Sequence, residues 1–464
     1  MDLTFTAQTA EHPEGSPPPR ATRLVEDSAR TFLYRILMFA LILLNGVVVA
    51  RALAPADKGA YNLAVALPRL LIRFGNLGIG AAAIYQIGKG GQAFKRIAGN
   101  ALGMGLIIGA LLTGLAIVAY GPLSASFLKG VNPVLFYMAV GTIALALMAD
   151  FAQDLLRGAR DIRNFNRSRI SHYVFLLTGT TTLLLALRLG TPGAMLAWIM
   201  TVVGEVTLAL LLLRRHAPLS LRLDRDLIGA MAGFGLRAYV MQFVMFLNYD
   251  LDIFIVNHFA LDTSSVGFYS LAAGLAETLW YFPNAVTIVL FPNIAADLKR
   301  GGELTPKACR HVLFLTLGSS LALGLAAPIF LPLIYGERYS PAIAPLLLLL
   351  PGVVALSVFK VLSTGLFGRG QPMLASRVAL AGLAAQIGMD FLLIPRLGIH
   401  GAALASTLAY SLMSVLGVLV YSRAAGVSAR DMLILKRDDW RVYGKLAALP
   451  WKRLRRGAPR QRIA

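Results

Sequence analysis

Long stretches without a charged residue are the feature that most constrains this chain; residues 97–128, for example, contain no Asp, Glu, Lys or Arg. A helix that crosses a bilayer needs about 20 mostly apolar residues, so such a stretch is long enough to span a membrane. Only 14% of the 464 residues are charged and 57% are hydrophobic, whereas soluble domains average about 25% charged residues. This composition excludes a soluble globular protein, a disordered one and, despite the net charge of +21, a partner of nucleic acid.

Windows of that length predict an all-α polytopic membrane protein with about 12 transmembrane helices. The expected helix cores are residues 31–52, 61–86, 99–120, 132–151, 170–190, 193–213, 230–256, 265–291, 311–335, 342–365, 373–394 and 400–422. The shortest turns are expected at 190–193 and 397–400, where two helices must reverse direction within a few residues.

Basic residues predict the orientation of these helices, because cytoplasmic loops retain Lys and Arg. With the N-terminus inside, the cytoplasmic segments hold 34 of the 44 basic residues. We therefore expect a multi-pass membrane protein with both termini in the cytoplasm. Residues 1–30 are polar, lack the apolar core of a signal peptide and are expected to be a disordered tail. Residues 424–464 form a basic tail that either binds anionic membrane lipids or is simply solvated.

The sequence contains an internal repeat. A shift of 208 residues aligns Ala52–Asn76 with Ala260–Asn284, with identical residues at ten of 25 positions, and the same shift aligns Gly190 with Gly398. Six helices per repeat is an even number, so the two halves have the same orientation and are related by an axis along the membrane normal. The expected lobes are residues 31–215 (helices 1–6) and 216–423 (helices 7–12).

Cysteine and histidine usage argues against metal chemistry. Cys309 is the only cysteine, and the six histidines are scattered without an i,i+3 or i,i+4 pair. Neither a thiolate nor an imidazole metal site is expected. The sequence also has no Walker-type phosphate-binding loop, so ATP is not expected to drive the protein directly. We expect no metal, no cofactor and no enzymatic activity, and energy from an ion gradient or from consumption of the product on the far side.

Several short motifs resemble a known family through their order along the chain. The loop after the first expected helix, Arg51–Tyr61 (RALAPADKGAY), is followed by Phe74–Gly78 (FGNLG). The further motifs are Leu155–Gly158, Asn248–Asp252, Val266–Ser270, Leu331–Gly336, Gly368–Pro372 and Ile394–Ala403. Over about residues 30–423 the chain resembles bacterial lipid-linked oligosaccharide flippases, the polysaccharide-export members of the multidrug/oligosaccharidyl-lipid/polysaccharide (MOP) exporter superfamily.

This resemblance implies a two-lobed transporter in which the first two helices of each half line a central cavity. It implies the substrate as well, a glycan linked to undecaprenyl diphosphate that moves from the inner to the outer leaflet for assembly of O-antigen, capsule or exopolysaccharide. The expected partners are this lipid-linked anionic glycan, a polysaccharide polymerase and glycosyltransferases, and the transporter is expected to be a monomer.

The functional prediction depends on ionisable residues at membrane depth. Placing a charged side chain at the centre of a membrane helix costs about 2.5–3.5 kcal/mol or more in free energy, so such residues normally face a cavity or a partner. Arg69 and Arg73 lie near the middle of the second expected helix. Their i,i+4 spacing places them on one face, where two guanidinium groups repel each other unless an anion joins them. The planar guanidinium suits phosphate oxygens, so the pair is a candidate clamp for a diphosphate head group. The alternative is a structural ion pair with an acidic residue on a neighbouring helix.

The repeat links Arg69 to an acidic residue, because a shift of 208 residues places it on Glu277 in the eighth expected helix. Pseudo-symmetry then puts the two side chains at matching depths on opposite lobes. They are candidates for an inter-lobe ion pair that forms in one state of the transport cycle and breaks when a substrate anion competes for the arginine. Alternatively, each charge is neutralised within its own lobe.

Three more basic residues are candidates for contact with an anionic substrate. Arg237 lies near the inner end of the seventh expected helix, Lys360 lies in the tenth, and Arg35 lies about one turn into the first. The long side chain of Lys360 can also extend towards the inner surface, and Arg35 is equally suited to lipid phosphates there.

Asp252 and Asp390 are candidate ion-pair or coupling residues together with Glu277. Arg237, Asn248 and Asp252 share one side of the seventh expected helix, which predicts a face in contact with water. Asp252 is expected towards the outer end of that helix, where it would pair near the membrane interface.

Two other functions compete with lipid-linked oligosaccharide export. A multidrug or cation antiporter of the same superfamily would carry acidic residues at the cavity centre, whereas the first two helices present Arg69 and Arg73; Glu277 and Asp390 keep this alternative open. A membrane-embedded glycan polymerase or ligase would be an enzyme with a large polar outer loop, and every expected outer loop is short.

Overall fold

The computed structural model describes residues 21–90, 93–216, 218, 223–259, 263–296 and 298–439, and in these ranges the chain is helical without a strand. The first half contains α1 (Ala21–Ala52), α2 (Pro55–Asn76), α3 (Ile79–Lys89), α4 (Phe94–Val118), α5 (Tyr120–Ser126), α6 (Pro133–Val140), α7 (Ile143–Gly158), α8 (Ile162–Thr180), the π-helical turn η1 (Thr181–Ala186) and α9 (Gly190–Leu213). The second half contains α10 (Arg225–Asp250), α11 (Asp252–Phe259), α12 (Ser264–Glu277), the 3₁₀ turn η2 (Thr278–Trp280), α13 (Tyr281–Ala296), α14 (Leu298–Tyr335), η3 (Glu337–Ala342), α15 (Ile343–Gly368), α16 (Pro372–Leu397) and α17 (Ile399–Ala425). A short terminal unit follows, made of α18 (Ala429–Leu433) and η4 (Arg437–Asp439).

The predicted all-α polytopic membrane fold is confirmed. Each of the twelve expected cores falls on one of these helices or on consecutive helical segments with short breaks between them. Eight helical segments of the described chain are long and apolar enough to cross a membrane. The other four expected cores correspond to α1, α8, α10 with α11, and α12 with α13.

Several of the expected continuous helices are broken, and one break lies where helices from the two halves meet. The core expected at 61–86 is interrupted at Leu77 (φ 46°) and Gly78 (φ 70°), which lie in the left-handed region. A Cβ atom on Gly78 would lie 2.2 Å from the carbonyl oxygen of Gly235 in α10, so only glycine fits this crossing. The core expected at 230–256 is divided near Leu251 into α10 and α11.

Both ends of the helical region extend beyond the predicted limits. The expectation of disorder through residue 30 is wrong for residues 21–30, because helix formers such as Ala21, Leu24 and Glu26 extend α1 to Ala21. Residues 1–20 lie outside the described chain. At the other end, the predicted tail is folded as far as Asp439, whose carboxylate pairs with Arg310 of α14 at 2.7 Å. The more basic part of that tail, residues 440–464, also lies outside the described chain.

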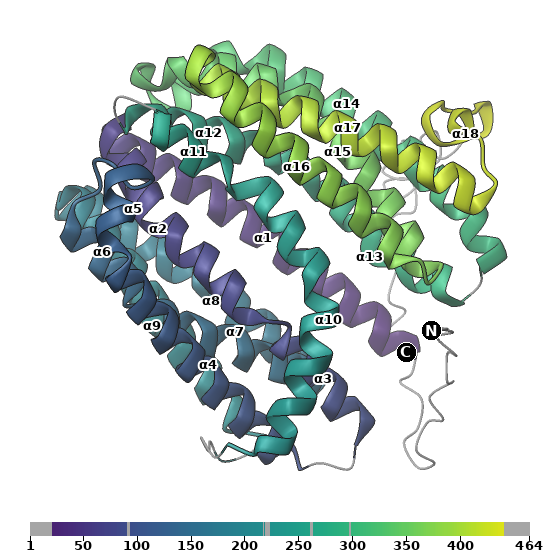
Figure 1. Ribbon diagram of the computed structural model, residues 1–464, viewed down its shortest axis with the longest axis horizontal. Helices are drawn as coiled ribbons and strands as arrows, with labels where there is room; N and C mark the ends of the chain where they lie inside the picture. Colours follow the sequence, from purple (N-terminus) through teal and green to yellow (C-terminus); the bar gives the residue numbers. More distant parts are fainter. Residues whose placement is uncertain are drawn as a thin grey trace, which may run out of the picture.

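The helices form two lobes that converge at one end of the molecule and diverge at the other (Figure 1). The ends of α2, α5, α11 and α12 lie together where the lobes converge. Helix α10 runs between the lobes: it packs against α3 of the first lobe and against α16 of the second. Asp224, the N-cap of α10, forms an ion pair with Arg96 of α4, and this ion pair attaches the N-terminal end of α10 to the first lobe.

The predicted repeat is visible as structure. Gly190 and Gly398, related by the 208-residue shift, both have positive φ, at 60° and 56°, in equivalent turns. The side chains of Asn62 and Ser270 obey the same shift and hydrogen-bond to each other at 2.6 Å. Repeat-related residues can touch each other only where they lie on the axis between the lobes, so this contact places the pseudo-symmetry axis at the crossing of α2 and α12.

Candidate functional site

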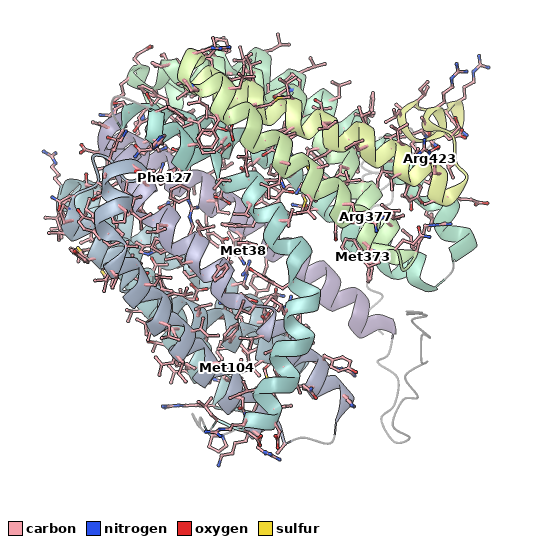
Figure 2. The ribbon with its side chains drawn as sticks, in the orientation of Figure 1. Met38, Met104, Phe127, Met373, Arg377 and Arg423 are labelled. Atoms are coloured by element: carbon pink, nitrogen blue, oxygen red, sulfur yellow. The ribbon has the colours of Figure 1, made fainter. Side chains whose placement is uncertain are left out.

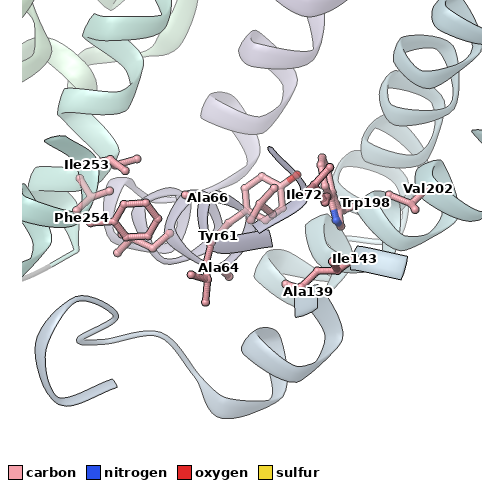
Figure 3. Packing of buried hydrophobic residues seen from close by; sticks show 14 of the residues in the cluster. Tyr61, Ala64, Ala66, Ile72, Ala139, Ile143, Trp198, Val202, Ile253 and Phe254 are labelled. Carbon is pink, nitrogen blue, oxygen red and sulfur yellow. The ribbon is translucent and has the colours of Figure 1, made fainter. Parts of the chain in front are cut away.

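Helix α2 lies at the boundary of the two lobes, where it packs against α4 and α7 of the first lobe and against α10 and α12 of the second. It begins at Pro55, whose fixed φ suits a first helical turn. Its buried face contributes Tyr61, Ala64 and Ile72 to a cluster that includes Trp198 and, from the second lobe, Phe254 (Figure 3). The other face carries polar residues at successive intervals of 4, 7, 4 and 3 positions, namely Lys58, Asn62, Arg69, Arg73 and Asn76. These intervals keep all five on one narrow stripe of the helix.

Arg69 and Arg73 of this stripe line a cavity beside α2. One part of the cavity has a volume of about 500 Å³ and the next part about 560 Å³. Arg73, Asp150 and Arg169 line both parts, so the two are continuous. Met38 of α1 lies at the centre of the molecule and contributes to the wall (Figure 2). The other charged and polar lining residues are Asn45, Asn76, Gln153, Asp154, Arg157, Asn166, His172, Glu205, Asp250 and Asn284.

Three arginines of this wall are available to an anion. Arg69, Arg73 and Arg169 are exposed to the cavity, and none forms an ion pair within 4 Å in the described part of the chain. The guanidinium carbon of Arg73 lies 5.9 Å from the ring centre of Phe246. The fourth arginine, Arg157, is paired with Asp154 at 2.5 Å.

The carboxylates of the wall differ in their partners. Glu205 of α9 is held on both oxygens, by His172 Nδ1 at 2.6 Å and by the Gln153 amide at 2.7 Å. Asp150 of α7 and Asp250 of α10 form no ion pair within 4 Å among the described residues, although both lie within electrostatic reach of Arg73. The site is therefore a mixed-charge cavity in which the unpaired charges are three arginines and two aspartates.

The lobes are joined at the end where they converge, which we call the sealed end: the α1–α2, α11–α12 and α14–α15 turns. Thr263 Oγ1 donates to the Ala56 carbonyl oxygen at 2.9 Å, and Tyr339 donates to the Leu53 carbonyl oxygen at 3.1 Å. Arg338 Nη2 donates to the Ala50 carbonyl oxygen at 2.8 Å. By the distribution of basic residues, this is the predicted outer end. The cavity extends the other way, along α7 and α8 to Arg157 and Phe165 near their connecting turn.

The sequence model of a family described as "Polysaccharide biosynthesis protein" matches residues 48–344. This match covers more than half of the chain. The chain belongs to this family. The membership confirms the resemblance drawn from the motifs. No curated protein sequence matches the chain significantly.

Solved structures of MOP-type transporters share the fold of this family member. "Lipid II flippase MurJ, inward closed conformation" matches with a TM-score of 0.72 at 15% identity, covering 92% of this chain and 100% of that chain. An inward-facing multidrug resistance MATE family transporter of the MOP superfamily matches with a TM-score of 0.69 at 16% identity, covering 84% and 94%. An outward-facing MATE family transporter gives 0.59 at 16% identity, with coverage of 87% and 95%. At these identities the likeness establishes the fold.

Of the residues predicted from the sequence, the structure brings Arg69 and Arg73 together in the cavity wall. Glu277, at the end of α12, interacts electrostatically with Arg69 but forms no ion pair with it within 4 Å in this conformation. Lys360 of α15 lies on the aromatic faces of Trp280 and Tyr249, with Nζ at 4.5 and 4.8 Å from the ring centres. Neither Glu277 nor Lys360 belongs to the wall of the cavity described above.

Asp252 and Asp390 meet inside the second lobe. Ser406 Oγ donates to Asp252 at 3.3 Å, Tyr269 also donates to Asp252, and the Gln386 amide donates to Asp390 at 3.2 Å and to Ser406 at 3.1 Å. Asp252 is 5% exposed and Asp390 is fully buried. These hydrogen bonds connect the two carboxylates to each other through Gln386 and Ser406.

The water-contacting face predicted for Asn248 and Asp252 is wrong, whereas the position of Asp252 near the membrane interface stays a prediction. Asn248 is 1% exposed. Its amide donates to the Val244 carbonyl oxygen at 2.9 Å and to that of Ala379 in α16 at 3.3 Å. Packing of α16 against α10 covers this face. The side chains of Arg237 and Arg35 lie outside the described part of the structure, so their roles stay predictions.

Sequence reasoning missed Asp150, Asp154, Arg157 and Arg169. The sequence predicts a cytoplasmic loop for Arg157 and Arg169, because the expected helix cores end at 151 and begin again at 170. Instead α7 continues to Gly158 and α8 begins at Ile162. The spacing of Asp150, Asp154 and Arg157, which places all three on one helical face, is the signal that could have extended α7.

Proposed function

We propose that the protein moves a glycan linked to undecaprenyl diphosphate from the inner to the outer leaflet of the bacterial inner membrane. The observation that carries this proposal is the trio of unpaired arginines, Arg69, Arg73 and Arg169, in the cavity of a polysaccharide biosynthesis protein. Helices α1, α2, α7, α8 and α9 of the first lobe and α10 of the second line this cavity. Guanidinium groups bind phosphate oxygens through paired hydrogen bonds. The amide and phenol groups of Asn76, Asn166, Asn284 and Tyr173 supply donors and acceptors for sugar hydroxyl groups on the same wall.

Alternating access supplies the movement. The conformation described here has a sealed end and a cavity that extends away from it, so the head group enters from the cytoplasmic side in our proposed orientation. The diphosphate then neutralises the arginines, and the lobes close around it while the sealed end separates. A change of this kind requires that the substrate bind the two states with different free energies.

We propose that Glu277, Asp252 and Asp390 couple this movement to an ion. Asp252 and Asp390 lie in one buried network in which hydroxyl and amide groups surround two carboxylates. Two carboxylates buried together favour uptake of a cation or proton. Lys360 and Arg237 are proposed to extend the substrate contacts, Arg35 to bind at the inner surface, and the basic tail to contact anionic lipids. A polymerase and glycosyltransferases are the proposed partners of a monomeric transporter.

Substitution of the cavity arginines tests the proposal. Arg69→Ala and Arg73→Ala should each abolish surface glycan at unchanged protein level, because truncation of either side chain leaves the diphosphate without one of its paired donors. Arg163→Ala is the matched control: Arg163 is an exposed arginine of α8 outside the cavity wall and should tolerate the change. A normal amount of surface glycan in cells with Arg69→Ala and in cells with Arg73→Ala would contradict the proposal.

A cation antiporter is the second candidate, and the cavity aspartates favour it specifically. Asp150 and Asp250 are unpaired and would attract an organic cation. An antiporter requires that Asp150→Asn abolish efflux of a cationic dye such as ethidium, whereas the flippase requires no dye efflux above background. Cells that overproduce the protein separate the two functions in one assay.

A further inference from the structure

Lys58 has a buried side chain without an acidic partner among the residues that the structure describes. Its side chain is 6% exposed at the sealed end, and no carboxylate lies within 4 Å of it in the described chain. The ammonium group donates to two neutral oxygens, the Gly267 carbonyl and the Ser270 hydroxyl, both at 3.2 Å. Its remaining contact is the ring of Tyr339, whose centre lies 5.9 Å away. An ammonium group with only neutral partners is costly at such a place, and a neutral donor would make the same hydrogen bonds across the seal.

Lys58 lies on the same stripe of α2 as the cavity arginines. Eleven residues separate it from Arg69, which corresponds to about 16 Å along a helix at 1.5 Å per residue. From Asn76 to Lys58 the stripe extends about 27 Å, close to the thickness of the hydrocarbon core. Arg73 and Arg69 are open to the cavity, whereas Asn62 and Lys58 lie in the seal. The stripe is thus a line of polar donors along the transport direction, with only its inner half accessible in this conformation.

Opening of the sealed end removes every hydrogen-bond partner of Lys58. Gly267 and Ser270 both belong to α12 of the second lobe, so separation of the lobes takes both oxygens away at once. The freed ammonium then faces the opened space at the predicted outer end. An anion that has travelled along α2 restores a partner to it.

We propose that Lys58 is the outer binding site for the diphosphate of the lipid-linked substrate, occupied only after the sealed end opens. The inference rests on the proposed function and adds a second anion site to it. The diphosphate binds first at Arg69 and Arg73, then passes to Lys58 as the lobes exchange their contacts. The competing explanation is a latch, in which Lys58 only fastens the two lobes. A latch needs hydrogen-bond donors; an anion site needs a positive charge.

Charge and hydrogen bonding can be separated by substitution. Lys58→Gln keeps donors for Gly267 and Ser270 but removes the charge, Lys58→Arg keeps the charge, and Ser270→Ala weakens the seal without touching the charge. Surface glycan is measured in cells, and binding of undecaprenyl diphosphate is measured on the purified protein. We expect Lys58→Gln to lower surface glycan by about tenfold or more, as for loss of one charge-assisted contact, with unchanged binding from the inward-open state. Lys58→Arg and Ser270→Ala should retain most of the glycan.

A second variant, with a lysine placed one turn away from position 58, distinguishes loss of the charge from misfolding of Lys58→Gln. Asn62→Lys in the Lys58→Gln background returns a cation to the stripe one turn away and should restore part of the glycan. Normal glycan from Lys58→Gln overturns the inference, as does equal loss from Ser270→Ala and Lys58→Gln, which identifies a latch. Failure to regain glycan in Asn62→Lys with Lys58→Gln also counts against it. Normal glycan from Arg69→Ala and Arg73→Ala would instead overturn the proposed function itself.

Discussion

At the residue scale, what distinguishes the charged groups of this membrane protein is whether they have partners. Glu205 has a partner on each carboxylate oxygen, and Arg157 is paired with Asp154. Arg69, Arg73 and Arg169 have no such partner within 4 Å in the described chain. An unpaired intramembrane charge costs several kcal/mol, which a protein retains where a ligand or a second conformation satisfies the charge. The cavity arginines therefore need either a substrate anion or a different arrangement of the lobes.

A different arrangement of the lobes, in which Arg69 gains a partner, gives a prediction for Arg69 and Glu277. The two form no ion pair within 4 Å in the conformation described here, so an ion pair between them would form when the lobes close around the cavity. Arg69→Glu and Glu277→Arg should each abolish export of surface glycan, because each puts two like charges across the lobe interface. The double reversal should restore part of the export, since the pair is rebuilt with opposite polarity. Absence of any rescue at equal protein levels would exclude the ion pair.

The same residues show how far the sequence could predict the site. Arg69 and Arg73 are recognisable from the sequence because both lie within one apolar helix at i,i+4. Arg169 is not recognisable in this way, because its helix begins in a polar segment and only packing of α8 against α9 and α1 turns it towards the cavity. The meeting of Asp252 with Asp390 was likewise out of reach, since 138 residues separate them and no local pattern links them.

At the scale of elements, the crossing of α2 and α12 depends on small residues. A Cβ atom on Gly59 would lie 1.8 Å from the carbonyl oxygen of Thr263, and one on Gly267 would lie 2.1 Å from that of Pro55. Apolar runs predicted the positions of these helices. They did not predict the crossing, because two glycines that permit close approach look the same in a sequence as glycines that merely pack.

Gly59→Ala should therefore force the sealed end open. Overpacking costs about 1–3 kcal/mol, and 1.4 kcal/mol shifts a two-state equilibrium tenfold. We expect an Asn62→Cys reporter to react several times faster with a membrane-impermeant thiol reagent when Gly59→Ala is present. Gly46→Ala is the matched control, because nothing lies within 4 Å of the added Cβ atom. Unchanged labelling would mean that the crossing tolerates the extra carbon.

The terminal unit of α18 and η4 is fastened to α14 by a buried ion pair. Arg310 donates to both carboxylate oxygens of Asp439, at 2.7 and 3.1 Å. The hydrogen bond from Arg310 lowers the pKa of Asp439 to about 2, against the opposing effect of burial. An ordinary aspartate has a pKa of about 3.9, so the stabilisation is fully present above that value and is lost as the pH falls through about 2.

Asp439→Asn should release this unit at neutral pH, because removal of one partner leaves Arg310 buried without its counter-ion. We expect amide hydrogen exchange of residues 429–439 to accelerate strongly in this variant, and in the wild type only as the pH is lowered below about 4. Asp431→Asn is the control: its pair with Lys436 is solvent-exposed, and exposed pairs contribute about 0–1 kcal/mol. Equal exchange in both variants would show that the terminal unit is held by other contacts.

At the scale of the whole molecule, the repeat explains why one end can be sealed while the other is open. Asn62 and Ser270 are equivalent residues of the two halves, and they hydrogen-bond to each other on the pseudo-symmetry axis. Contacts on an axis can break without a change in the fold of either lobe, because each lobe keeps its own core. The bonds of Arg338 and Tyr339 to the α1–α2 turn have the same property, since each crosses from one lobe to the other. The sealed end is therefore a set of replaceable contacts, and rocking of two rigid lobes is the movement that would exchange them.

A cross-link on the axis should stop transport and leave binding intact. Asn62→Cys with Ser270→Cys places two thiols on opposite lobes at the hydrogen-bonded position, and the native Cys309 is buried, so background reaction is low. A short bifunctional methanethiosulfonate reagent should join them and block export of lipid-linked glycan in vesicles. Undecaprenyl diphosphate should still bind with wild-type affinity, because Arg69, Arg73 and Asn76 stay in the cavity wall. Dithiothreitol should restore export, and each single cysteine should be insensitive to the reagent. Export that continues through the cross-linked protein would show that the sealed end does not open during transport, since two lobes joined on their axis cannot separate there.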